Sequence, residues 1–353
     1  MKAVPRASAA PLMCVVGGAA LVGQTILVRE LMVSFYGTEL ALAAVLSCWL
    51  LFIPVGALVA AGVLRRWDGS AAPICWGLGG MAAGLLAEFL LARLVRPLVG
   101  ADTGEFLSMG AMLAGAALAA APMAFWVGFF FPVVANAEER RVPGQGKGIS
   151  RIYVAEAVGS ACTGALLSFY LLSRLDPASI ALAAAAVLLL CAAWYVAGAS
   201  VGRFVAGSVA LLALLLVSTA AGRSGAFFAL APLLAVVAWL RIGGRPGSRL
   251  RVASGVLLAL GIAVSLLSVI GGQRLSEWSM GERWRTFSRF HLVAARDSRY
   301  QHIELGERQG TYVLVQDGFH TAQFPEPAAT RARAALFLTQ HPHPRDVLVI
   351  GGG

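Results

Sequence analysis

The sequence predicts an all-α polytopic membrane bundle of about nine transmembrane helices, followed by a truncated α/β tail. Hydrophobic residues make up 58% of the chain and charged residues only 13%, whereas soluble proteins carry roughly a quarter charged residues. The mean hydropathy of +0.76 agrees with this imbalance. After Gly271 the composition changes abruptly, because ten arginines and eight acidic residues follow. These observations divide the chain into a multi-pass membrane domain, residues 1–271, and a soluble segment, residues 272–353.

A transmembrane helix needs about 20 consecutive apolar residues, and the membrane domain contains nine stretches of this kind. They lie near residues 11–36, 40–64, 73–95, 106–135, 152–172, 178–198, 204–222, 225–240 and 252–271. The eighth stretch is short, and the fourth is long with Pro122 and Pro132 inside it, so eight to ten spans fit the pattern. Similar stretches follow the first one, which is therefore expected to stay in the mature protein rather than act as a cleaved signal.

The loops alternate in positive charge, and this alternation predicts an orientation. One set of loops holds Lys2, Arg6, Arg65, Arg66, Arg140, Arg141, Lys147, Arg151, Arg203, Arg241, Arg245, Arg249 and Arg251, and the other holds Arg29, Arg93, Arg96, Arg174 and Arg223. Since positive charges near span ends stay in the cytoplasm, the N-terminus is predicted to be cytoplasmic. Nine spans would then place the tail outside, so either one span is miscounted, which we favour, or the tail is not a cytosolic enzyme domain.

The net charge of +10 does not predict nucleic-acid binding, because the basic residues are spread over short loops rather than gathered on one folded face. Such residues are typical of contacts with lipid headgroups, and the lipid bilayer is the expected partner. The five cysteines lie in apolar stretches without C-x-x-C spacing, and His341 and His343 have no third ligand nearby in the sequence. No metal site is predicted.

Ionisable and amide side chains inside the apolar stretches are candidate functional residues, since a charge near the bilayer centre costs at least about 2.5 kcal/mol. The candidates are Gln24, Arg29, Glu30, Glu88 and Glu156. Glu156 lies among Gly and Ser residues that would allow close helix packing, and a pair with Arg29 would neutralise both charges. Alternatively, Arg29 and Glu30 snorkel at the membrane interface, and Glu88 lies near a span end, one or two turns from arginines on its own helix.

The soluble segment predicts strands, a helix and a glycine loop in that order. Residues 299–305 and 311–315 have strand character and are separated by glycines, which favours a hairpin. Asp317-Gly318 predicts a second tight turn. Residues 327–340 predict a helix bounded by prolines, and the apolar residues 347–350 predict a buried parallel strand that runs into the glycines. The chain ends in this loop, so it is expected to be the front part of a longer protein.

Three groups of residues in this segment carry a resemblance to a known family. They are Tyr300-Gln301-x-Ile303, Asp317-Gly318 and His341-Pro-x-Pro344-Arg345-x-Val347-Leu-Val-Ile-Gly351-Gly-Gly353. In this order they resemble the spermidine synthase family of aminopropyltransferases. The resemblance implies a small β-sheet domain before a Rossmann-like domain whose glycine loop binds decarboxylated S-adenosylmethionine. It also makes Gln301, Gly351, Gly352 and Gly353 the candidate cofactor-binding residues.

Two departures from the family pattern bear on activity. The acidic and tyrosine-containing segment that helps to form the diamine site in the family is here Pro325-Glu326-Pro327-Ala-Ala-Thr-Arg331, in which only Glu326 matches. The catalytic Asp and the acid that holds the ribose lie beyond the glycine loop in the family. The catalytic residues are therefore unknown, and this chain alone is expected neither to bind the cofactor nor to catalyse the transfer, because proton removal needs a positioned acid or base.

The membrane half is similar to a bacterial branch of the family in which a helix bundle precedes the synthase domain. The similarity rests on Gly17 to Leu21 with Gln24, on Gly128-x-x-x-Pro132 and on Tyr153 to Gly164. It implies a bacterial inner-membrane protein with a small amine as substrate and with self-association as a further option. Two functions follow: a membrane-anchored transferase of the aminopropyltransferase type, or a transporter or scaffold whose tail is a degenerate regulatory remnant.

Overall fold

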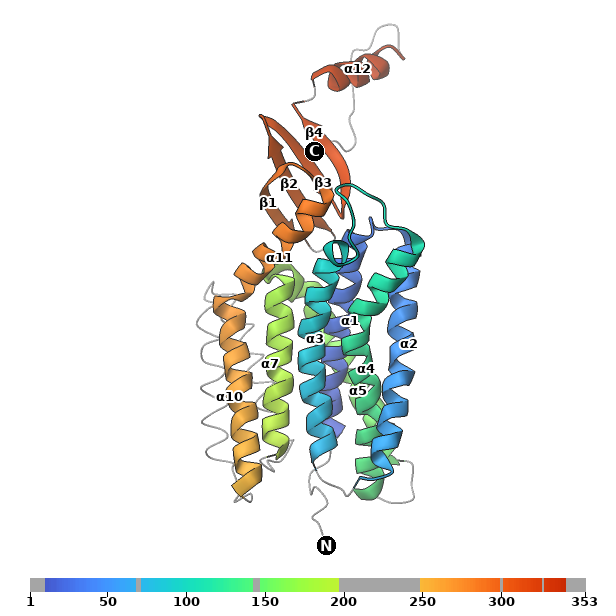
Figure 1. Ribbon diagram of the computed structural model, residues 1–353, viewed down its shortest axis with the longest axis vertical. Coiled ribbons are helices and arrows are strands. Elements are labelled where there is room, and N and C mark those ends of the chain that lie inside the picture. Colours follow the sequence, from blue (N-terminus) through green and yellow to red (C-terminus); the bar gives the residue numbers. More distant parts are fainter. Residues whose placement is uncertain are drawn as a thin grey trace.

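The computed structural model describes residues 10–67, 71–141, 147–196, 248–298, 301–325 and 327–340. It shows a bundle of long helices with a small antiparallel sheet at one end (Figure 1). Six helical segments in these ranges are long and apolar enough to cross a membrane, and a bent pair adds a seventh candidate. The protein is therefore a multi-pass membrane protein. Two of the nine predicted spans, at 204–222 and 225–240, lie outside the described residues.

The first four spans match the predicted positions within a few residues. They are α1 (Ala10–Ser34), α2 (Glu39–Leu64), α3 (Ala72–Leu98) and α4 (Met109–Arg141). A tight turn joins α1 to α2, where Tyr36 and Gly37 both have positive φ and the Thr38 side chain caps α2 by accepting a hydrogen bond from Ala41 N at 3.2 Å. Such a side-chain acceptor satisfies an orphan amide of the first turn.

The fifth and sixth spans follow in the same pattern. The fifth consists of α5 (Lys147–Leu166), a π-helical turn (Leu167–Leu171) and the short α6 (Leu172–Arg174), and the sixth is α7 (Pro177–Val196). After the undescribed segment comes α10 (Ser248–Ile270), which packs against α7. Helices α1, α3 and α5 run toward the sheet, whereas α2, α4 and α7 run away from it (Figure 1).

Glycines set the close contacts between helices of the bundle. A Cβ atom on Gly56 of α2 would overlap the carbonyl oxygen of Phe125 on α4, and one on Gly128 of α4 would overlap that of Ile53. Likewise, Gly17 of α1 packs against the carbonyl oxygen of Glu156 on α5. Without a hydrophobic driving force between helices in lipid, such backbone approach supplies much of the packing attraction.

A helix that the sequence analysis did not predict, α11 (Gly272–Phe287), follows α10 directly. The two helices are bent by 66° at their junction, so α11 crosses the end of the bundle beneath the sheet (Figure 1). Its residues Ser276, Ser279 and Arg283 are buried. Their spacing of three and then four residues places them on one face of the helix. Met280 and Trp284 are buried as well, so the buried side of α11 mixes polar and apolar residues.

The sheet contains four antiparallel strands in the order β1-β2-β3-β4. They are β1 (His291–Asp297), β2 (His302–Arg308), β3 (Thr311–Gln316) and β4 (Phe319–Phe324), and the helix α12 (Pro327–Leu338) follows. The predicted turn at Asp317-Gly318 is confirmed, with both residues at positive φ, as a two-residue hairpin requires. The first hairpin turn is tighter than predicted, at Gln309-Gly310, and β1 was not predicted. The predicted Rossmann-like strand at 347–350 lies outside the described residues.

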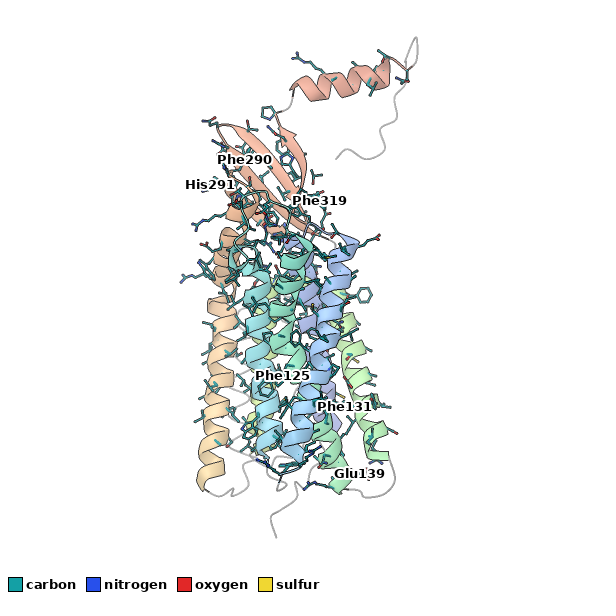
Figure 2. All side chains as sticks on the ribbon, turned by 45° about the vertical axis from the view of Figure 1, so that its right-hand side comes forward. Phe125, Phe131, Glu139, Phe290, His291 and Phe319 are labelled. Carbon is teal, nitrogen blue, oxygen red and sulfur yellow. The ribbon has the colours of Figure 1, made fainter. Side chains whose placement is uncertain are left out.

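Trp284 of α11 connects the sheet to the bundle. It packs with Val313 and Val315 of β3 in a small core separate from that of the bundle, and its indole N–H donates to the carbonyl oxygen of Phe290 at 2.7 Å. Figure 2 shows Phe290 and Phe319 at the sheet and Glu139 at the opposite end of the bundle. The contact of Trp284 with Val313 and Val315 therefore attaches the sheet to α11 at one end of the membrane domain.

Candidate functional site

A network of charged side chains lies where the bundle, α11 and the sheet meet. It draws one or two residues from each of α1, α3, α11, β1 and β2, and those residues are Glu30, Arg93, Arg283, Asp297, His302 and Glu304. All of these side chains are buried or nearly so. We call this set the junction network. Because buried charges are costly unless paired, its members hold the two parts of the protein in one arrangement.

Glu30 is the centre of the half that lies in the bundle. Its Oε1 accepts a hydrogen bond from Arg93 Nη2 at 2.8 Å, and its Oε2 accepts from Arg93 Nε and from Arg283 Nη1 at 2.7 Å. Both arginine side chains are 0% exposed. The bidentate contact with Arg93 and the further contact with Arg283 fix the orientation of the Glu30 carboxylate.

Arg283 carries the network into the sheet. Its Nη2 lies 2.8 Å from His302 Nε2 and 3.5 Å from Glu304 Oε1. His302 Nδ1 lies 2.8 Å from Asp297 Oδ1, and its Nε2 lies 3.1 Å from Glu304 Oε1. The Asp297 contact keeps a proton on Nδ1 in either charge state of the imidazole, whereas the contact with Glu304 is a hydrogen bond only when Nε2 is protonated.

The pKa shifts of the sheet residues follow from this arrangement. Burial and the Arg283 cation oppose the charging of His302, but its hydrogen bonds with Asp297 and Glu304 outweigh both and raise the pKa of the imidazole. Burial also opposes ionisation of the two carboxyls, yet His302 and the arginines hold the pKa of Asp297 and of Glu304 below the ordinary value. With Arg29, which lies 3.8 Å from Asp297, three arginines face the three carboxylates, and protonation of His302 adds a further positive charge.

This balance predicts how the attachment of the sheet depends on pH. Because the pKa of His302 is raised in the folded state, its stabilising contribution is complete below the unfolded value of about 6.5 and is lost as the pH rises through the folded value. The lowered pKa of Asp297 and of Glu304 gives the opposite dependence, with stability lost in acid. The protection factors of the β1 and β2 amides, which correct each exchange rate for its intrinsic base-catalysed rise with pH, should therefore fall in alkaline solution in the wild type. The His302→Gln variant should lack this alkaline slope, and equal slopes would contradict the assignment.

A third buried arginine, Arg96, lies beside the junction network. Its guanidinium donates to Thr286 Oγ1 at 3.0 Å, to the carbonyl oxygen of Ser34 at 3.2 Å and to that of Glu105 at 2.8 Å. It also lies over the rings of Tyr36 and Phe287, at 5.1 and 4.6 Å from their centroids. Cation–π contacts of this kind strengthen when desolvated, so Arg96 ties the end of α3 to the α1–α2 turn and to α11.

The structure corrects the predicted roles of the residues at the end of α1. Glu30 does not snorkel at the interface but is buried against two arginines. Arg29 donates to the carbonyl oxygen of Ser298 at 2.9 Å and lies 3.8 Å from Asp297. The predicted pairing of Arg29 with Glu156 is wrong, since Glu156 packs level with Gly17, and Arg29 lies twelve residues farther along α1, about 18 Å away along the axis.

Glu88 is fully buried on α3. Neither carboxylate oxygen has a hydrogen-bond partner among the described residues, because Arg93 binds Glu30 and Arg96 binds Thr286. Gln24 is half-buried on α1. Glu88 is thus an isolated polar group inside the bundle and not part of the junction network.

Gln301 lies in the turn between β1 and β2, with its side chain half-exposed. Its backbone N–H donates to Ser298 Oγ at 2.9 Å, and this contact is not part of the junction network. The other candidate cofactor residues, Gly351, Gly352 and Gly353, lie outside the described residues. Among the described residues no cluster of His, Cys, Asp or Glu has the geometry of a metal site.

Sequence reasoning missed the network residues that follow the membrane domain, namely Arg283, Asp297, His302 and Glu304. One usable signal was present, since β2 buries His302 and Glu304 on one face while Ile303 and Leu305 on the other are only half-buried. A strand whose polar residues face inward needs buried partners for them. Their direct partners are Asp297 of β1 and Arg283 of α11, and Arg283 in turn binds Glu30 of α1, which is 253 positions away in the sequence.

The junction network is suited to holding the sheet on the bundle rather than to catalysis. Its side chains pair mainly with one another and are largely closed to solvent, although Glu304 Oε1 and Oε2 and Arg283 Nε have no hydrogen-bond partner among the described residues. No group in it can therefore reach a substrate in this arrangement. The fold and the network together define a multi-pass membrane protein with an extramembrane sheet clamped to the end of its helix bundle. Comparison with known proteins found no match for the chain among family models, curated proteins or solved structures.

Proposed function

We propose that the protein is an integral membrane relative of the spermidine synthases, whose sheet holds a transferase domain with a nucleoside cofactor at the membrane surface. The observation that carries the proposal is the four-stranded antiparallel sheet followed by a helix, the order that the resemblance implies. Decarboxylated S-adenosylmethionine is the cofactor expected by resemblance, and a small amine is the acceptor. The junction network gives such a domain a fixed position on the bundle.

Transfer activity tests this proposal directly. The protein expressed from its complete natural reading frame, in detergent, should convert decarboxylated S-adenosylmethionine and a diamine into the aminopropylated amine. Gln301→Ala should weaken cofactor binding by up to about tenfold, since a lost hydrogen bond contributes roughly 0.5–1.5 kcal/mol. Gln316→Ala on β3 is the matched control and should bind as the wild type does. Absence of both product and nucleoside binding in the wild type would refute the proposal.

The arrangement of the bundle bears on which side the sheet occupies. The start of α1 and the sheet lie at opposite ends (Figure 1), so they face opposite sides of the membrane. When α11 is counted with the sheet end, the two ends of the bundle carry equal numbers of basic residues near the described span ends. The sheet end has Arg29, Arg93, Arg96, Arg174, Arg274, Arg283, Arg285 and Arg289, and the other end has Arg65, Arg66, Arg140, Arg141, Lys147, Arg151, Arg249 and Arg251. Among the described span ends, the charge asymmetry that predicted a cytoplasmic N-terminus is therefore absent.

The transferase proposal requires the sheet to face the cytoplasm of a bacterial cell, where a soluble nucleoside cofactor is supplied. In a cysteine-free background, Asp102→Cys in the exposed loop at the sheet end should resist a membrane-impermeant maleimide in intact cells. Arg66→Cys at the opposite end should react with it. The reverse pattern would place the sheet outside and exclude a cytosolic transferase.

A transporter or scaffold with a regulatory sheet is the second candidate function. It is favoured by one observation, the buried carboxyl of Glu88 inside the bundle, which has no hydrogen-bond partner among the described residues, since ionisable residues within spans mark ion and substrate paths. Uptake or efflux of a radiolabelled diamine by proteoliposomes, lost in Glu88→Gln, would support this candidate over the transferase. Equal transport by vesicles without the protein would count against it.

A further inference from the structure

The Glu88 side chain occupies a space between three helices of the bundle. Its Oε1 lies 3.0 Å from the point that a Cβ atom on Gly23 of α1 would occupy, and Met123 of α4 and Leu85 of α3 lie 3.2 and 3.4 Å from the same point. The carboxyl group therefore fills room left by the missing side chain of Gly23. Glu88 is 0% exposed, and the apolar side chains of Met123 and Leu85 lie around the same point.

No charged group of the neighbouring helices that the structure describes compensates Glu88. On its own helix, Arg93 and Arg96 are engaged with Glu30 and Thr286. The titratable groups that the packed helices contribute are Cys14, Arg29 and Glu30 on α1, Glu138, Glu139, Arg140 and Arg141 at the far end of α4, Cys191 and Tyr195 on α7, and Glu277, Glu282, Arg283 and Arg285 with Arg274 on α11. None of them forms a hydrogen bond or ion pair with Glu88 in the part of the chain that the structure describes.

We propose that Glu88 is an intramembrane proton-binding site, which holds a proton in the conformation seen here and releases it when water reaches the Gly23 contact. A carboxylate without a counter-ion in this surrounding would carry the full desolvation cost, and binding a proton removes that cost. A metal ion would need several oxygen ligands, whereas no acidic cluster lies here among the described residues. The site is independent of the transferase proposal.

The position of the site connects it with the junction network. Gly23 and Glu30 are seven residues apart on α1, which places them on the same face of the helix, two turns or about 10 Å apart. Helices α1 and α3 run in the same direction (Figure 1), and Arg93 follows Glu88 by five residues. A proton released toward the sheet end would therefore reach the Glu30 region first.

Carbodiimide labelling tests the protonated state. N,N′-dicyclohexylcarbodiimide adds to a protonated carboxylic acid and rearranges to a stable N-acylurea, so the adduct mass is the sum of the two reactants. In the full-length protein in detergent, we expect an adduct on the peptide that contains Glu88 and none on Glu30, which is ion-paired. Glu88→Gln should lose the adduct, and Glu156→Gln, a half-buried glutamate on α5, should keep it.

Infrared spectroscopy decides the case if the reagent cannot enter the bundle. The wild type should show the carbonyl band of a protonated carboxylic acid, this band should be absent in Glu88→Gln, and it should disappear reversibly in alkaline solution. A band that is identical in wild type and Glu88→Gln would overturn the assignment. A Glu88 band that persists at every pH at which the protein stays folded would also overturn it, since it would show a permanently neutral structural group.

Discussion

Replacing Glu30 by alanine is expected to lower the free energy of unfolding by about 3–5 kcal/mol, because it leaves the Arg93 and Arg283 guanidinium groups buried without their shared counter-ion. Both side chains are 0% exposed, so water cannot replace the lost carboxylate without opening the junction. The sheet should then separate from the bundle before the helices unfold. Thermal unfolding in detergent measures the first effect, and protease sensitivity of residues 288–298 measures the second.

The matched control for Glu30→Ala is Arg285→Ala, which removes an arginine two residues after Arg283 on α11. Arg285 pairs with Glu282 at 2.8 Å, but its side chain is 75% exposed, and exposed ion pairs contribute at most about 1 kcal/mol. If Glu30→Ala were no less stable than Arg285→Ala, the junction network would not hold the sheet. A combined variant that replaces all six network residues by apolar residues of similar size should recover stability, since replacing a whole buried ion cluster is often neutral.

Two glycines of α2 should respond in opposite directions to the same substitution. Gly56→Ala would drive a Cβ atom into the backbone of α4 at Phe125, whereas Gly62 has nothing within 4 Å. Overpacking of this kind costs about 1–3 kcal/mol, and a backbone atom cannot move aside as a flexible side chain can. Gly62→Ala should instead be neutral or stabilising by up to about 1 kcal/mol, since alanine favours helix over glycine.

Thermal unfolding and the yield of monodisperse protein from size-exclusion chromatography measure the difference between the two glycine variants. A destabilised Gly56→Ala beside an unaffected Gly62→Ala would show that α2 and α4 pack at backbone distance. Equal behaviour of the two variants would show that the helices are farther apart than the structure places them. Gly128→Ala, which meets Ile53 from the other helix, should behave like Gly56→Ala.

Much of the membrane half could be predicted from local sequence. The spans near 11–36, 40–64 and 178–198 correspond to α1, α2 and α7, because apolar length alone determines whether a segment can cross a bilayer. The Asp317-Gly318 turn was predictable for a similar reason, since few residues accept the positive φ that a two-residue hairpin needs. In both cases the information lies within one short stretch of chain.

The partners of the charged residues could not be predicted in this way. Arg29 and Glu156 looked complementary in the sequence, yet helix register places them about 18 Å apart along α1. Glu30 and Arg283 looked unrelated across 253 positions, yet they form a 2.7 Å hydrogen bond. The helix α11 was missed because Ser276, Ser279 and Arg283 are buried on it together with Met280 and Trp284, and this mixture lacks the continuous apolar stripe by which a surface helix is found.

The sequence by itself determined that this is a multi-pass membrane protein with a tight hairpin turn at Asp317-Gly318, because apolar length and local turn residues act without reference to distant partners. It also identified Glu30 and Glu88 as residues whose burial would need an explanation. Only the tertiary structure decided that Glu30 is neutralised by Arg93 and Arg283 while Glu88 has no partner among the described residues. The physical reason is that the cost of a buried charge depends on groups within a few ångströms, and helix packing alone selects those groups.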